Sequence, residues 1–141
     1  MATRYFALIF GIIYTLVGVM GLIPAMLQPM APGNPPVTLD ILSGNLLGLF
    51  PVNILHTVVH LIVGIWGIVA YRSFTAARSF SIMTGIAFLA LFLFGLIPGL
   101  QTLFGLMPLH AADRWLHLAS GAVALFFGLT APRGTEVTDR A

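Results

Sequence analysis

Four long apolar segments constrain what this chain can fold into. They cover residues 5–23, 52–71, 80–97 and 111–130, and each is bounded by charge, proline or glycine. A helix rising 1.5 Å per residue needs ~20 residues to cross the hydrocarbon of a bilayer. Backbone polar groups in lipid must pair within the segment, and these segments lack the alternation of barrel strands. The pattern predicts an all-α, integral membrane four-helix bundle.

Composition agrees with a membrane location and excludes several functions. Of the 141 residues, 59% are hydrophobic and only 7% are charged, whereas soluble domains carry about a quarter charged residues. The arginines are scattered singly, so no nucleic-acid surface is expected. The absence of cysteine excludes disulfides and thiolate chemistry. No nucleotide-binding, nucleophile-elbow or zinc-protease motif is found. We therefore expect no catalytic residues. The expected partners are the lipid bilayer, a second copy of the chain or another membrane protein.

An internal repeat organises the chain. Residues 47–67 recur as 104–124, an offset of 57, and residues 11–24 match 85–98, an offset of 74. The chain therefore reads as two tandem helical hairpins, about 4–72 and 78–132, in a single membrane domain at 1–132. The first segment has an internal counterpart, so we expect a retained helix rather than a signal peptide. Two helices per repeat put both repeats the same way up, related by a pseudo-two-fold axis along the membrane normal.

The connections predict an orientation. The proline-rich loop at 25–45 is expected to be irregular, with a short interfacial helix through Ile41, Leu42 and Leu46 that Thr38 or Asp40 would cap. Five of the six arginines fall on one side of a four-helix chain, and only Arg114 falls on the other. The positive-inside rule then places both termini, the second connection and a short tail at 133–141 in the cytoplasm.

Polar residues form a stripe on the second segment and again on the fourth. Helical spacing aligns Asn53, His56, His60, Gly64 and Gly67, and it aligns His110, Asp113, His117, Gly121 and Gly128. The glycines are expected to let helices approach closely. Asn53 is a good N-cap, and Asp113 suits the first helical turn. His110 is a poorer cap and is expected to face water outside.

The histidines deeper in the stripes admit several interpretations. His60 and His117 each lie about 10 Å below the start of the helix, where an ionisable group needs a partner or a water cavity. The simplest interpretation is a hydrogen-bonded network that fixes helix register and needs no cofactor. Alternatives are a divalent metal site using His56, His60, Asp113 and His117, a haem b between His60 and His117, and a proton relay.

Two short stretches resemble the signatures of a known family. Residues 46–60, LLGLFPVNILHTVVH, contain His56 and His60, and residues 112–118, ADRWLHL, contain Asp113, Trp115 and His117. Both resemble motifs of small bacterial four-helix membrane proteins catalogued only as a domain of unknown function. The resemblance implies a multi-pass protein of the bacterial inner membrane and no particular activity. We expect a non-enzymatic structural or accessory membrane component. One alternative is a membrane protein that binds a metal or haem through the histidines and Asp113. Another is a small oligomeric transporter or proton-conducting element.

Overall fold

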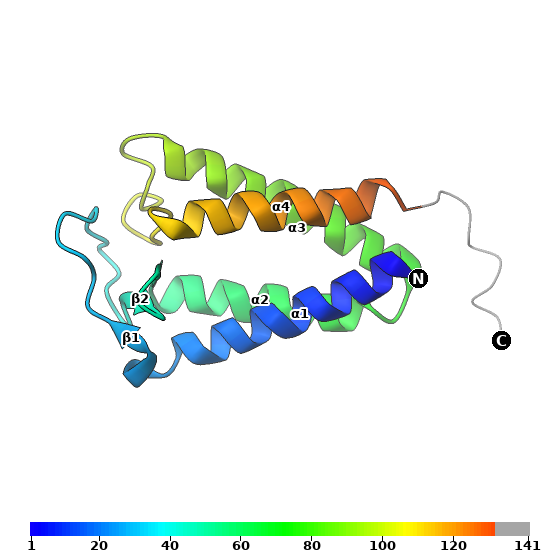
Figure 1. Ribbon diagram of the computed structural model, residues 1–141, viewed down its shortest axis with the longest axis horizontal. Helices are drawn as coiled ribbons and strands as arrows, with labels where there is room; N and C mark the ends of the chain where they lie inside the picture. The colour runs from blue at the N-terminus through cyan, green and yellow to red at the C-terminus, as the bar shows by residue number, and fades with distance from the viewer. Residues whose placement is uncertain (132–141) are drawn as a thin grey trace.

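Four helices make up most of residues 1–131, the part of the chain that the computed structural model describes (Figure 1). They are α1 (Ala2–Gly21), α2 (Ile54–Ala70), α3 (Phe74–Leu96) and α4 (Ala112–Leu129). Each helix falls on one of the predicted apolar segments, so the all-α class is confirmed. The expected tail, 133–141, lies outside the described residues.

The third helix begins earlier than the sequence predicted, at Phe74 rather than at residue 80. The reason is local: the side chain of Ser73 accepts a hydrogen bond from the backbone N–H of Ala76, which caps the first turn. Arg78, expected in the connection, therefore lies on α3. The connection between α2 and α3 shrinks to residues 71–73.

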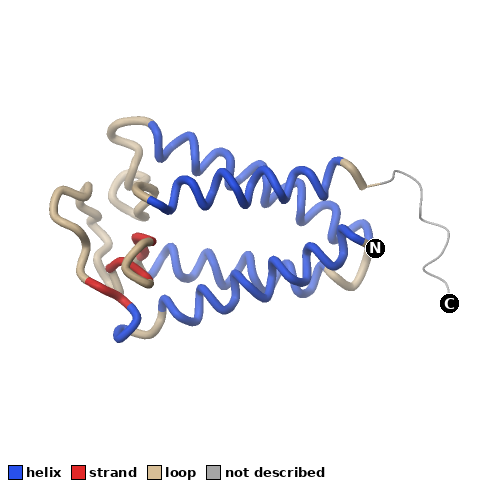
Figure 2. Tube along the Cα trace, in the orientation of Figure 1, coloured by secondary structure: helices blue, strands red, loops and turns tan. Residues whose placement is uncertain are grey.

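The helices pack as two pairs, α1 along α2 and α3 along α4 (Figures 1 and 2). Glycines form both contacts. A Cβ atom at Gly11 would lie 2.6 Å from the backbone nitrogen of Ile68 and 2.7 Å from the carbonyl oxygen of Gly64. In the other pair, a Cβ at Gly85 would lie 2.9 Å from the backbone nitrogen of Leu125 and 3.0 Å from the carbonyl oxygen of Gly121. The lack of a side chain thus allows backbone-to-backbone packing in each pair.

The long connection between α1 and α2 contains a small sheet instead of the predicted interfacial helix. After a 3-10 turn at Pro24–Met26, strands β1 (Leu27–Gln28), β2 (Gly44–Leu46) and β3 (Phe50–Val52) pair antiparallel in that order. Leu47 (φ 54°) and Gly48 (φ 73°) form a tight turn that folds β3 back on β2. Within the predicted helix, Leu42 has a φ of 49° and Gly44–Leu46 form strand β2. Neither fits a right-handed helix, so the helix prediction for residues 41–46 was wrong.

The two connections at this end of the molecule are joined to each other. The backbone N–H groups of Thr38 and Leu39 both donate to the carbonyl of Gly105, at 2.8 and 3.2 Å. The amide of Asn53 donates to the carbonyls of Leu39 and Leu106, at 2.8 and 2.7 Å. Figure 2 shows the resulting layer of loops and short strands across the same end of all four helices. The layer covers the polar ends of α2 and α4.

Polarity is distributed unusually between interior and surface. The aromatic core, which includes Phe10, Phe80 and Phe88, is buried together with many polar groups. The outer faces of the helices carry exposed aliphatic and aromatic side chains such as Ile9, Ile62 and Phe126. Of the described helices, α1 and α3 are long and apolar enough to cross a membrane, and α2 is a shorter apolar helix. The buried polar residues are Thr3, Asn53, His56, Thr57, His60, Ser81, Thr84, His110, Asp113 and His117.

Candidate functional site

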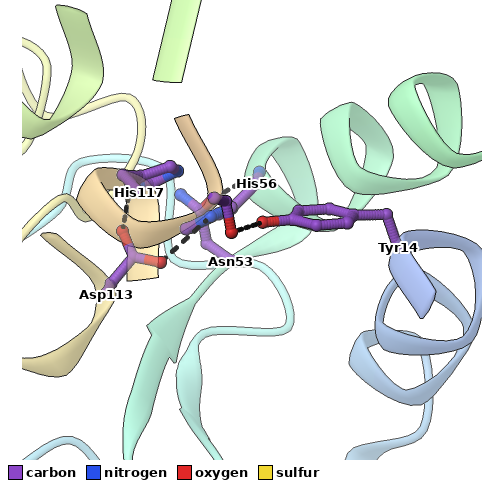
Figure 3. Close-up of polar contacts among 6 residues, drawn as sticks. Tyr14, Asn53, His56, Asp113 and His117 are labelled. Atoms are coloured by element: carbon purple, nitrogen blue, oxygen red, sulfur yellow. Dashed lines mark hydrogen bonds and ion pairs between the residues drawn. The ribbon is translucent and has the colours of Figure 1, made fainter. Parts of the chain in front are cut away.

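Four ionisable side chains meet between α2 and α4. His56 and His60 lie one turn apart on α2, and Asp113 and His117 lie one turn apart on α4. Each of the four is buried, with an exposure between 1% and 3%. Figure 3 shows His56, Asp113 and His117 directed toward one another from the two helices. The structure therefore brings together all four residues that the sequence offered as candidate metal ligands, here called the His/Asp cluster.

The carboxylate of Asp113 stands between two imidazoles. Its Oδ2 lies 3.1 Å from Nδ1 of His117 on the same helix, and its Oδ1 lies 3.5 Å from Nε2 of His56 on the other (Figure 3). The first is a close contact at ion-pair distance, and the second is a longer polar contact. Asp113 thus orients His117 and links the two helix pairs.

The three histidines are packed tightly against one another. The rings of His56 and His60 are 4.5 Å apart between centroids, and those of His56 and His117 are 5.9 Å apart. One nitrogen from each of these three rings can be chosen so that all three lie within 4.8 Å of one another. The Nε2 atom of His60 is buried and has no hydrogen-bond partner among residues 1–131. A buried, unpaired ring nitrogen is costly and indicates a ligand or an ordered water.

Aromatic and hydroxyl side chains surround the cluster. Tyr14 of α1 stands edge-on to His60, with 5.2 Å between ring centroids, and its hydroxyl donates to the Oγ of Ser120 on α4 at 2.8 Å. Phe88 of α3 stands edge-on to His117 at 5.1 Å. Sequence reasoning missed all three residues. A hydroxyl in the middle of an apolar segment was the available signal for Tyr14, whereas the role of Phe88 has no local signature.

The residues at the helix starts behave differently from each other. Asn53 is the N-cap of α2, and its Oδ1 accepts a hydrogen bond from the backbone N–H of His56 at 3.0 Å. By contrast, α4 begins after Ala111 with no side-chain cap, and Asp113 turns toward the histidines instead. The position of Asn53 fixes the first turn of α2 and with it the direction of His56.

His110 does not face water, contrary to expectation. The residue is only 5% exposed. Burial lowers the pKa of His110 below 6.5, and the positive charge of Arg114 lowers it further. The neighbouring motif residue Trp115 is exposed and stacks near the guanidinium of Arg114, which is 5.4 Å from its ring centroid. Neither residue belongs to the His/Asp cluster.

The glycines of the two stripes lie where the helices of each pair touch. A Cβ at Gly67 would lie 2.8 Å from the carbonyl oxygen of Ala7, and one at Gly128 would lie 3.0 Å from the backbone nitrogen of Ile82. Together with the contacts of Gly64 and Gly121, they hold α2 against α1 and α4 against α3. The histidines on the same stripes are thereby directed inward, toward the space between the two pairs.

The fold and site define a small helical protein with a buried histidine–aspartate cluster and two helices apolar enough to cross a membrane. The sequence model of the family described as Domain of unknown function (DUF4383) matches residues 4–130, and the chain belongs to that family. The family resemblance noted in the sequence is therefore confirmed. Neither a curated protein nor a solved structure matches the chain.

Proposed function

We propose that this chain is a multi-pass membrane protein that binds one divalent transition-metal ion at His56, His60 and His117. In this proposal all four helices span the plasma membrane of a bacterium, with the sheet-bearing end outside and both termini in the cytoplasm. The observation that carries the metal proposal is the convergence of three buried imidazoles whose nitrogens lie within 4.8 Å of one another.

The distribution of polarity supports the membrane placement. In water, a small protein that buries ten polar side chains and exposes aliphatic rows on every helix would carry large apolar patches. In lipid the same distribution is favourable, because apolar side chains face the hydrocarbon and ionisable groups face the bundle interior. The orientation rests on Arg4 and Arg72, which lie at the end of the molecule opposite the small sheet.

In-register packing supports the two tandem hairpins. Gly85 lies 74 positions after Gly11, which is the offset between the two copies of the first helix. Leu125 lies 57 positions after Ile68, which is the offset between the two copies of the second helix. Gly11 contacts Ile68, and Gly85 contacts Leu125. The positive φ angles of Leu47 and Gly48 recur 57 positions later at Phe104 and Gly105, with φ of 60° and 84°. Equivalent residues thus make equivalent contacts in both hairpins.

The dimensions of the cluster suit a tetrahedral ion. Three nitrogens bound at about 2.1 Å to a tetrahedral Zn²⁺ are roughly 3.4 Å apart. The three ring nitrogens in the structure lie within 4.8 Å of one another. Ring movements of about 1 Å each would therefore bring them to the metal-bound spacing. Three protein nitrogens leave a fourth position open for water or another ligand. Neutral imidazoles favour Zn²⁺, Cu²⁺ or Ni²⁺ over Mg²⁺ or Ca²⁺, which prefer oxygen ligands.

Asp113 has the place of an orienting residue in such a site. A histidine that binds a metal usually donates its other ring N–H to a carboxylate or carbonyl, which fixes the tautomer. The 3.1 Å contact between Asp113 Oδ2 and His117 Nδ1 leaves Nε2 of His117 as the ligand atom. Asp113 would then also balance part of the ion's charge inside the bundle.

The geometry favours the metal over the other interpretations of the cluster. A purely structural network would pair its polar atoms, whereas Nε2 of His60 lacks a partner among the described residues. A haem between His60 and His117 would need a planar gap between those rings. The ring of His56 lies close to both of them, with 4.5 and 5.9 Å between ring centroids, so a haem plane there would also have to displace His56.

Metal stoichiometry of the purified protein tests the proposal. The protein would be extracted in mild detergent without chelator, dialysed against Zn²⁺, desalted and analysed by mass spectrometry of the metal, with Co²⁺ as a visible probe of geometry. We expect about one ion per chain and absorption bands of tetrahedral Co²⁺. His56→Gln, His60→Gln and His117→Gln should each lower the occupancy steeply.

The fourth histidine supplies a matched control. His110→Gln changes a buried imidazole of the same protein that lies outside the cluster, and it should retain the ion. A wild type with no stoichiometric Zn²⁺ or Co²⁺, or a His110→Gln protein that loses as much metal as the cluster variants, would overturn the proposal. Circular dichroism of each variant separates the loss of a ligand from the loss of the fold.

A further inference from the structure

A cavity lies along the seam between α1 and α4, beside the His/Asp cluster. It has a volume of about 270 Å³. Its walls come from α1, from the β2–β3 hairpin and from α4, with His60 of α2 at one side. The apolar wall residues are mostly aliphatic, with two phenylalanines among them, Phe10 and Phe50. The seam is available because α1 packs mainly on α2 and α4 mainly on α3.

Four polar side chains gather in this otherwise apolar cavity. They are Tyr14, His60, Asp113 and Ser120. The hydroxyl of Tyr14 donates to Ser120 across the seam at 2.8 Å, and His60, which is 3% exposed, has an unpaired Nε2. An apolar pocket with a few converging polar groups is the usual form of a small-molecule site. The polar groups here would bind one end of a ligand and the walls would bind the rest.

A second cavity continues the first along the same seam. It has a volume of about 300 Å³ and shares Phe10, Ile13 and Ser120 with its neighbour. Its other lining residues include Ile9 and Val123, which are 56% and 46% exposed on the outer faces of α1 and α4. In the proposed membrane placement these faces contact lipid. A molecule would therefore reach the seam from the hydrocarbon and not from water.

We propose that the α1–α4 seam binds a lipid-soluble molecule with a neutral, oxygen-bearing head, such as a quinone or a long-chain alcohol. The head would lie at Tyr14 and Ser120, beside His60, and the apolar body would extend along Phe10 and Ile13 toward the second cavity. This inference rests on the proposed membrane placement and does not require a bound metal ion.

Charge and size select this class among membrane components. Asp113 lines the cavity, so an anionic head such as a fatty-acid carboxylate or a lipid phosphate would meet a like charge in a buried place. The two cavities together reach the lower part of the ~300–1,000 Å³ range of small-molecule sites, which accommodates one chain or ring system. The hydroxyl of Tyr14 can donate to a carbonyl or alcohol oxygen in place of its bond to Ser120.

Photolabelling in membranes tests the proposal. Membranes holding the full-length protein would be incubated with a long-chain alcohol that carries a diazirine near its hydroxyl, irradiated, and the labelled residues mapped by peptide mass spectrometry. We expect label within residues 10–20 and 113–120. An excess of a decyl-substituted benzoquinone or of decanol should compete at least tenfold better than decanoic acid at pH 8.

A pair of valine variants on α1 supplies the control. Val17→Phe fills the cavity that Val17 lines, and Val19→Phe adds the same volume on the exposed face of the helix. Labelling should fall at least fivefold in the first variant and remain in the second. Because the mapping in the wild type is independent of either variant, a Val17→Phe protein that fails to fold does not weaken the test.

Three outcomes would overturn this inference. They are label spread evenly over outward-facing residues, equal competition by the fatty acid, and label that Val17→Phe leaves unchanged. Repeating the experiment with Zn²⁺ and with chelator separates this site from the metal site. If the protein remains with the membranes after alkaline extraction but shows none of the expected labelling, the seam proposal fails while the proposed membrane placement stands.

Discussion

Oδ2 of Asp113 lies 3.1 Å from Nδ1 of His117, one turn along the same helix, and this contact determines which nitrogen of His117 faces the other histidines. A carboxylate in this place fixes the tautomer and the ring orientation of a ligand histidine. Both residues are almost fully buried, with 1% and 2% exposure, so water cannot replace the contact. The first prediction concerns the loss of this charge.

Asp113→Asn should weaken metal binding without removing it. The amide keeps the size of the side chain and one oxygen acceptor for His117, but it removes the negative charge beside the ion. Loss of an orienting carboxylate typically costs about 10–100-fold in metal affinity. Competition with a chromophoric chelator measures the affinity. Asp40→Asn, in the exposed part of the long connection, serves as the matched control, and equal affinities for the two variants would contradict the assignment.

The folded protein should lose stability in acid partly through His110. Its pKa is held below 6.5 by burial and by Arg114. Above pH 6.5 the ring is neutral in both the folded and the unfolded state. As the pH falls below 6.5, the unfolded chain takes up the proton first, so the free energy of unfolding decreases by up to about 1.4 kcal/mol per pH unit.

The variant His110→Gln isolates this contribution. Unfolding in mixed micelles, followed by circular dichroism between pH 5 and pH 7.5, should show a shallower loss of stability in the variant than in the wild type. Arg114→Gln should also reduce the slope, because it removes the nearby positive charge. If the wild type and His110→Gln lose stability in parallel across this range, His110 is not the titrating group.

The packing of α4 on α3 predicts a sharp contrast between adjacent positions. Gly121 lies against Gly85 and Leu89, whereas Ala122 is on the exposed face of α4. Gly121→Leu should therefore destabilise the protein by about 1–3 kcal/mol or more, because overpacking a closed contact forces the helices apart. Ala122→Leu should change the free energy of unfolding by less than ~0.5 kcal/mol. Similar losses for both variants would mean that the two helices separate easily.

Cysteine labelling tests the proposed orientation, since the chain has no cysteine of its own. A cysteine at Asn34, in the long connection, should react with a membrane-impermeant maleimide on intact cells. A cysteine at Thr75, at the start of α3, should react only after the cells are opened. Thr75 is exposed, so its protection in intact cells would come from the membrane and not from the fold. The reverse pattern would place the termini outside.

The helices were predictable because their signals are local. Apolar length located all four, and Asn53 and Ser73 supply the caps of α2 and α3. The spacing of His56, His60, Asp113 and His117 placed them on one face of each helix before their distances were known. Their meeting depends on how the two helix pairs face each other. The repeat in the sequence indicates that the two helix pairs are equivalent, but it does not give the distance between their side chains.

The parts that sequence reasoning missed depend on contacts between distant residues. The sheet forms because Leu46 pairs with both Leu27 and Phe50, and the local pattern around residue 42 gives no sign of those partners. His110 was expected in water because a polar residue near a helix start usually lies at the surface. The structure buries it at the end of the molecule where the two connections are joined by hydrogen bonds from Thr38 and Leu39 to Gly105, which no local pattern predicts.

The division of the His/Asp cluster between the two helix pairs has a consequence for biogenesis. In the proposed membrane placement, His56 and His60 would be inserted before Asp113 and His117. A nascent chain with only its first half in the membrane would then hold two imidazoles of the cluster and lack both the third imidazole and the carboxylate that orients it. If the proposed metal site is correct, retention of the ion would report completed assembly of the molecule. Two separately expressed halves, cut between α2 and α3, would each bind an ion weakly and would regain tight binding only by associating with each other.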